Sequence, residues 1–216
     1  MDKLAEYVSK TAALAVTHQC THQCHQDSHR QVHEGTLYAE GEPPRGYWEK
    51  LRRLAARYGY TLQRSYLPTG LNGEGCSGFT VGYLPPEARW EHPEVSQFAI
   101  YVQVGLTPAT EFFVVVHELT HAILKHPTQS AADLDRVMAK RQGEKECPDQ
   151  ELQCHFAGVA VAKQHGVRIR KSAVCYLQDR VKHARYRPTL RDQQEALRAA
   201  RVISSALSSV SYARAA

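Results

Sequence analysis

The chain lacks the long hydrophobic runs of a membrane protein. None of its apolar stretches approaches the roughly 20 residues that a helix needs to cross a bilayer. Near the N-terminus, the apolar stretch at residues 12–16 is too short for a secretory signal, and Asp2 and Glu6 lie close to the early lysine. We therefore expect a cytoplasmic protein with no membrane partner.

The lack of a secretory signal also decides how we interpret the six cysteines. Disulfides belong to oxidising compartments, so we expect reduced thiols here. With 216 residues, of which 43% are hydrophobic and 23% charged, the chain has the composition of an ordinary globular protein and is long enough for one substantial core.

Positive charge is concentrated in one region. Ten lysines and arginines but only three acidic residues fall between Arg168 and Arg201, although the net charge of the whole chain is only +5. This basic region indicates either solvated helix faces or a surface that contacts DNA or an acidic protein.

A metal-binding pattern, HELTH, follows an apolar run in the middle of the chain. On a helix, His117 and His121 lie about one turn apart on the same face and can bind one metal ion. Glu118 lies one position round the helix and can reach a water on that metal without being a ligand. Two ligands, an open coordination position and a general base are the parts of a zinc hydrolase.

The segments around this motif predict an α+β fold, with a small antiparallel or mixed sheet followed by helices. β-branched and aromatic residues between turn-rich segments predict strands at residues 60–67, 78–84 and 97–106. Apolar periodicity and helix-ending residues predict helices in the first thirty residues and at 47–58, 131–141, 148–165, 172–186 and 189–208. Glycines and prolines predict a linker at residues 35–46.

The helix that carries HELTH has clear predicted ends. Thr107 is a good N-cap, and Pro108 suits the first helical position. Pro127 cannot continue the helix, which should therefore end near His126.

A catalytic zinc normally has three protein ligands, and the third is not obvious here. The extended pattern H-E-x-x-H-x-x-G-x-x-H requires a histidine where the chain has Pro127, and His126 is one residue early. A carboxylate from a downstream helix is the remaining source. Glu151 is the best candidate, ahead of Glu146 and Asp149, which precede that helix or fall in its first turn.

Three more residues are candidates for the same site. His155, four residues after Glu151, could hydrogen-bond the metal-bound carboxylate or stabilise the oxyanion, and Tyr176 is a second candidate for the oxyanion. Cys154 points roughly toward the site and could compete as a thiolate ligand, although a packed core cysteine is the more frequent state.

The stretch HELTHAILKHP, followed some thirty residues later by ELQCHFAGV, resembles the zinc metallopeptidases of the ImmA/IrrE type. It is also similar to the zincin domain of ArdC-type antirestriction proteins from phages and mobile elements. In those families the second helix carries a glutamate, then a small residue and a polar one, and these places hold Glu151, Cys154 and His155 here. The cysteine and the histidine depart from the usual residues.

The resemblance covers roughly residues 47–207 and implies a zincin-like fold, in which the sheet packs on an active-site helix and a glutamate helix. It divides the chain into an N-terminal His/Cys-rich helical segment with a linker, residues 1–46, and a metallopeptidase domain, residues 47–216. The N-terminal segment does not match the single-stranded-DNA-binding region of ArdC-type proteins, so DNA binding is not carried over.

A second cluster of histidines and cysteines lies at residues 18–33. Such side chains can chelate a soft divalent ion. A structural zinc site usually takes its ligands from two separate elements, however, and all of these lie on one segment. The sequence leaves open whether this cluster binds metal or is a polar helix with an incidental composition.

These patterns predict a zinc-dependent peptidase, and the resemblance implies that its substrate is one specific protein. Zinc held by His117, His121 and Glu151 activates a water whose proton Glu118 transfers, and the strand at residues 98–104 could pair with an extended substrate.

The alternative is a non-proteolytic, zinc-stabilised binding protein with an antirestriction or regulatory role. It would contact protein or DNA through its basic C-terminal helices, with Arg191, Arg198 and Arg201 as the important residues.

Overall fold

A computed structural model of the chain describes residues 2–17, 38–66, 78–81, 98–126, 148–171, 173–175 and 186–209. These residues form an α+β structure, as predicted. The main helices are α1 (Lys3–Thr17), α3 (Tyr47–Arg57), α4 (Pro108–Leu124), α6 (Pro148–Gln164) and α8 (Leu190–Ser208). The strands are β1 (Ala39–Glu40), β2 (Thr61–Ser65), β3 (Gly78–Val81), β4 (Ala99–Gln103) and β5 (Arg168–Ile169). The helix expected at 131–141 and most of the helix expected at 172–186 lie outside the described residues.

The three predicted strands form one mixed sheet in the order β2-β4-β3. β2 is parallel to β4 and β3 is antiparallel to it, so that Leu62 and Thr80 both pair with Ile100. Because β4 has a strand on each side, the prediction that the strand at 98–104 pairs with a substrate is wrong. Among the described residues, β3 is hydrogen-bonded to a neighbouring strand on one side only, and both β3 and β4 lie against α4.

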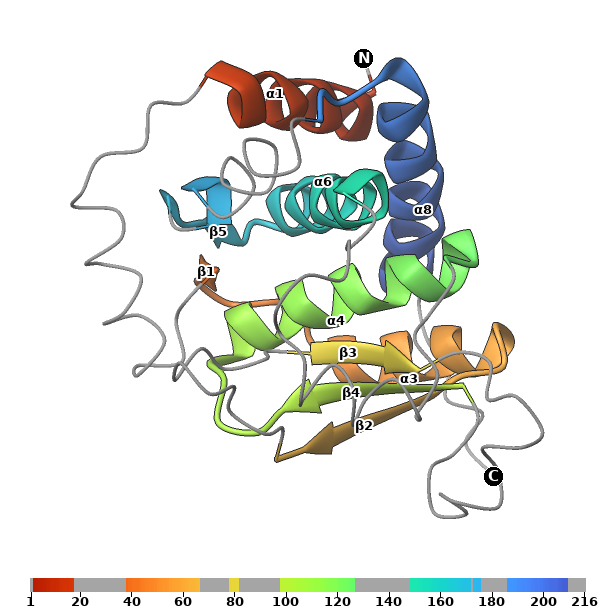
Figure 1. The fold of residues 1–216 in the computed structure, drawn as a ribbon. Coiled ribbons are helices and arrows are strands. Elements are labelled where there is room, and N and C mark those ends of the chain that lie inside the picture. The colour runs from red at the N-terminus through yellow and green to blue at the C-terminus, as the bar shows by residue number, and fades with distance from the viewer. Residues whose placement is uncertain are drawn as a thin grey trace, which may run out of the picture.

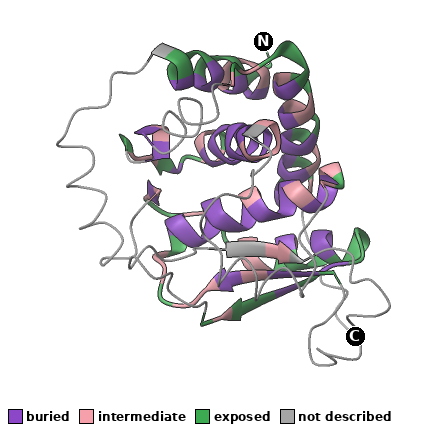
Figure 2. Cartoon of the chain, viewed as in Figure 1, coloured by how far each residue is buried: buried purple, intermediate pink, exposed green. Residues whose placement is uncertain are grey.

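The helices are stacked on the sheet in layers, as Figure 1 shows: α4 covers the sheet, α6 lies on α4, and α1 lies beyond α6. α8 runs across the ends of these helices and packs against all three. Figure 2 shows that α4 and α6 are the most buried helices. From Leu152 to Ala162 every residue of α6 is buried, because α6 has helices on several sides.

The ends of α4 follow the sequence signals. The hydroxyl of Thr107 accepts a hydrogen bond from the backbone N–H of Thr110 at 3.4 Å, and Pro108 is the first helical residue. At the other end, Lys125 adopts a left-handed conformation with φ of 55°. The N–H of His126 then bonds to the carbonyl of His121 at 3.0 Å, which is the pattern of a Schellman motif. This turn folds His126 back over the last turn of the helix.

A glycine allows α4 and α6 to approach closely. A Cβ atom at Gly158 of α6 would lie 3.0 Å from the ring of Phe113 on α4. Phe113 is only 2% exposed, so its ring has little room to move. The close approach of the two helices is what brings their polar residues together.

The N-terminal residues share the core with the rest of the chain. Leu4, Val8, Ala12 and Ala15 form the buried stripe of α1, which packs against α6 and α8. Within the predicted linker, β1 pairs with β5 in antiparallel fashion. None of the described helices combines the length and apolar composition that crossing a bilayer requires.

Candidate metal centre

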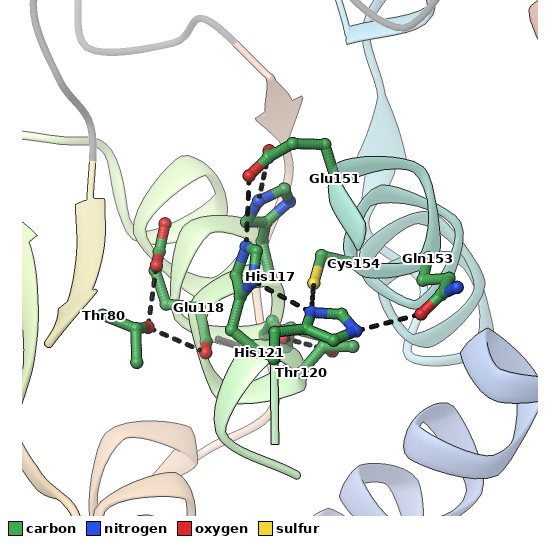
Figure 3. Close-up of polar contacts among 10 residues, drawn as sticks. Thr80, His117, Glu118, Thr120, His121, Glu151, Gln153 and Cys154 are labelled. Atoms are coloured by element: carbon green, nitrogen blue, oxygen red, sulfur yellow. Dashed lines mark hydrogen bonds and ion pairs between the residues drawn. The ribbon is translucent and has the colours of Figure 1, made fainter. Parts of the chain in front are cut away.

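Two histidines on α4 and one glutamate on α6 meet between these helices, as Figure 3 shows. Nε2 of His117 lies 3.3 Å from Oε2 of Glu151, and Nε2 of His121 lies 3.4 Å from Oε1 of the same carboxylate. The histidine side chains are 13% exposed and that of Glu151 is 23% exposed, so the site is largely shielded but open to solvent at Glu151. The structure thus brings together the three residues predicted as metal ligands.

These separations suit ligands around one ion better than a hydrogen-bonded pair. A direct N–H···O bond is about 2.9 Å long. Two ligands that each bind a tetrahedral zinc at about 2.0–2.1 Å lie roughly 3.3 Å from each other. Two imidazole nitrogens and one carboxylate are also a donor set that catalytic zinc uses. The residues present therefore fit zinc.

The charge state of Glu151 also suits a ligand. Burial alone would raise the pKa of its carboxyl group, but the nearby ring nitrogens of His117 and His121 hold that pKa well below its ordinary value. Glu151 is therefore a carboxylate, which is the form that binds a metal ion.

Cys154 lies close enough to act as an alternative ligand. Its sulfur and one nitrogen from each of His117 and His121 all lie within 4.8 Å of one another. The residue is fully buried, and burial raises the pKa of its thiol to about 12. In the absence of a metal ion the thiol is protonated, so Glu151 is the better prepared ligand of the two.

Glu118 lies on the side of the histidine pair that faces β3, away from α6 (Figure 3). The hydroxyl of Thr80 donates to Oε2 of Glu118 at 2.8 Å and also lies 3.0 Å from the backbone carbonyl of Glu118. Glu118 is only 7% exposed, so this hydroxyl fixes a carboxylate that has little contact with water. The strand that holds Thr80 was predicted from the sequence, but spacing alone could not show which of its residues meets Glu118.

His126 is close to the metal centre but behind one of the ligands. Its Nδ1 lies 3.0 Å from Nδ1 of His121 and 3.6 Å from the sulfur of Cys154, and its Nε2 lies 2.9 Å from Oε1 of Gln153. Burial, together with the charge of His121, lowers the pKa of His126 to about 4. The sequence pattern did not favour His126 as a third ligand. In the structure His126 lies next to Nδ1 of His121, the nitrogen that does not face Glu151.

His155 lies within the core rather than at an open surface. It is 1% exposed, and its ring meets Phe113 and His117 edge to face, with centroid separations of 5.1 Å and 6.0 Å. Burial lowers its pKa to about 3, so the ring is neutral. This position suits support of His117 better than contact with a substrate oxyanion. The other predicted candidate for the oxyanion, Tyr176, lies outside the described residues, as does the cluster at 18–33.

In the basic region 168–201, several of the arginines that the structure describes form ion pairs with acidic side chains. Arg168 and Arg170 both pair with Glu40 on β1. On α8, Arg198 pairs with Glu195 at 2.8 Å and Arg201 pairs with Asp2 at 2.6 Å. These contacts reduce the charge that this part of the surface offers to a partner.

Comparison of the chain with protein-family models, with curated proteins and with solved structures gives no match.

Proposed function

We propose that the protein is a zinc-dependent metallopeptidase with a zincin-like fold, in which His117, His121 and Glu151 hold the metal and Glu118 is the general base. The observation that carries the proposal is the meeting of these three ligands at zinc-compatible separations beside a buried glutamate. A zinc site that only stabilises a fold does not need a general base. The resemblance of the stretches HELTHAILKHP and ELQCHFAGV to ImmA/IrrE-type metallopeptidases supports the same assignment.

The chemistry divides between the metal and Glu118. Zinc bound here would lower the pKa of a water to near neutrality and polarise the carbonyl of the scissile peptide. Glu118 takes the proton from the attacking water and delivers it to the leaving amine. Because Thr80 donates to Oε2 of Glu118, we expect Oε1 to be the oxygen that receives the proton.

The substrate is proposed to be an extended segment of a specific protein. β3 lies beside α4 and supplies Thr80 to Glu118, so a peptide that runs along this strand would pass the reacting groups. Backbone hydrogen bonds to a strand edge are a general way of holding an extended peptide. β3 therefore replaces the strand at 98–104 as the proposed docking strand.

The test compares wild type with Glu118→Gln. Zinc per chain is measured by plasma mass spectrometry, and each protein is then incubated with a proteome-derived peptide library in which new N-termini are identified by mass spectrometry. We expect the variant to keep one zinc per chain and to cleave about 10²–10⁴-fold more slowly, since this is the usual contribution of a general base.

The matched control is Glu49→Gln, which changes an exposed glutamate on α3 and should cleave like wild type. Equal cleavage by Glu118→Gln and wild type would contradict the mechanism.

The alternative, a zinc-stabilised protein that binds DNA or an acidic protein through α8, finds less support. Two of the three arginines on which it depends, Arg198 and Arg201, are already paired with acidic side chains. It predicts that Arg191→Ala weakens a salt-dependent shift of DNA in a gel, whereas Glu118→Gln leaves that shift unchanged.

A further inference from the structure

The two ring nitrogens of His121 face different residues, and only one of them faces the metal centre. Nε2 faces Glu151, and Nδ1 faces His126. A neutral imidazole that binds a metal through Nε2 carries its proton on Nδ1, so this N–H needs an acceptor. The atom in that position is Nδ1 of His126, at 3.0 Å.

The direction of the hydrogen bonds beyond His126 follows from the far end of the chain of contacts. The carboxylate of Asp192 can only accept, so Nε2 of Gln153 donates to its Oδ1 at 2.8 Å. The carbonyl oxygen of Gln153 therefore points to His126, whose Nε2 lies 2.9 Å away and must donate. A neutral His126 that donates from Nε2 has its lone pair on Nδ1 and accepts from His121. All three bonds run in one direction, from His121 to Asp192.

Asp192 is itself firmly held. It is 1% exposed and lies in the first turn of α8. Its second oxygen, Oδ2, accepts from the hydroxyl of Tyr186 at 2.7 Å and from the backbone N–H and hydroxyl of Thr189 at 2.7 Å and 2.8 Å. The bond from the backbone N–H of Thr189 to Oδ2, together with the bond from the N–H of Asp192 to the hydroxyl of Thr189, makes the capping box that begins α8. The acceptor that ends the chain is thus fixed by the start of the C-terminal helix.

We propose that His126, Gln153 and Asp192 are positioning residues that hold His121 in the tautomer whose Nε2 faces the metal, so that zinc affinity depends on the docking of α8 on α6. The inference rests on the proposed function, because it takes His121 as a zinc ligand. A metal-bound histidine usually donates its second N–H directly to a carboxylate, a carbonyl or a water. Here a chain of three bonds takes that place and ends on a carboxylate of another helix.

The experiment measures the zinc dissociation constant by competition with a chromophoric chelator. His126→Ala and Gln153→Ala should each weaken zinc binding by about 10–100-fold, the usual effect of removing such a partner. His126→Asn should retain more affinity than His126→Ala, because the amide oxygen can accept near the place of Nδ1. The matched control is Gln164→Ala, which changes an exposed glutamine on α6, the helix that carries Gln153. This variant should bind zinc like wild type.

The outcomes separate this inference from the proposed function. If wild type binds one zinc that His117→Ala loses, while His126→Ala and Gln153→Ala stay within about twofold of wild type, the positioning chain alone is overturned. If wild type binds no zinc, the proposed function is overturned and the inference with it. Should His126→Ala fail to fold by circular dichroism, Gln153→Ala decides the question, since it leaves both histidines in place.

A spectroscopic measurement distinguishes positioning from a general loss of structure. In the zinc-loaded protein, the proton on Nδ1 of His121 should give a resonance protected from solvent exchange, because it is hydrogen-bonded to His126 in a partly buried site. We expect this resonance to disappear or exchange rapidly in His126→Ala while the backbone amide resonances of α4 stay in place. An unchanged, protected resonance in that variant would overturn the inference.

Discussion

The two sides of the histidine pair are built differently. On the side of α6 and α8, Glu151 faces one ring nitrogen of each histidine, and hydrogen bonds continue from His121 through His126 and Gln153 to the start of α8. On the side of β3, the hydroxyl of Thr80, from a strand at the edge of the described sheet, donates to the carboxylate of Glu118. Under the proposed function, the side of α6 and α8 holds the metal, and the side of β3 carries out the chemistry.

The largest expected effect is on zinc content, from a substitution at Glu151 on the side of α6 and α8, here called the holding side. We expect Glu151→Ala to lose most of its zinc, measured by plasma mass spectrometry. The two histidines alone do not supply the three protein ligands that a catalytic zinc normally has. Cleavage of the peptide library should fall with the zinc. The control is Asp149→Ala, the carboxylate two residues earlier on α6, which should keep its zinc. A variant at Glu151 that retains one zinc per chain would place the third ligand elsewhere.

The packing that joins α4 to α6 can be tested without touching a polar group. Gly158→Val should destabilise the fold by about 1–3 kcal/mol, because its side chain would overlap the ring of Phe113 in a closely packed core. The measurement is the free energy of unfolding in urea, with zinc removed so that metal binding does not add to stability. Gly166→Val, at a left-handed turn with φ of 79° where an added Cβ would meet no atom within 4 Å, is the comparison for strain without overlap. If Gly158→Val is as stable as wild type, the close approach of the helices does not depend on this glycine.

The features best predicted from the sequence are those that depend on local spacing. The start of α4 at Thr107 and Pro108 and the pairing of His117 with His121 need only a helix. His126 was beyond such reasoning, because it reaches His121 through a left-handed turn at Lys125 rather than through helical spacing.

Contacts between segments that are distant in the sequence could not be predicted either. Thr80 and Glu118 are 38 residues apart in the sequence. They meet only because β3 pairs with β4 and lies against α4. The pattern T-x-x-D at Thr189 is typical of a capping box, but the second contact of Asp192, with Gln153, depends on how α8 docks on α6. Sequence spacing carries no information about that docking.

A smaller effect is expected on the side of β3. Thr80→Val removes the hydroxyl that donates to Glu118 and should lower kcat by about tenfold, since a hydrogen bond to a charged group contributes roughly 1.5–3 kcal/mol before other groups compensate. Zinc content should not change, because Thr80 is not on the holding side. Thr80→Ser restores the hydroxyl and should recover most of the activity. If Thr80→Val loses zinc as well, the two sides of the site are not separate.

The smallest expected effect is at Cys154, and it decides which ligand set is present. Cys154→Ala should change zinc affinity by less than about threefold, because the buried thiol, with its pKa raised to about 12, is a poorer ligand than the ionised Glu151. The measurement is the same chelator competition, run beside Glu151→Ala. If the order is reversed, so that zinc is lost with Cys154→Ala and kept with Glu151→Ala, the metal is held by His117, His121 and the thiolate. Thiolate ligands are typical of structural zinc, so that result would favour a zinc-stabilised binding protein over the peptidase.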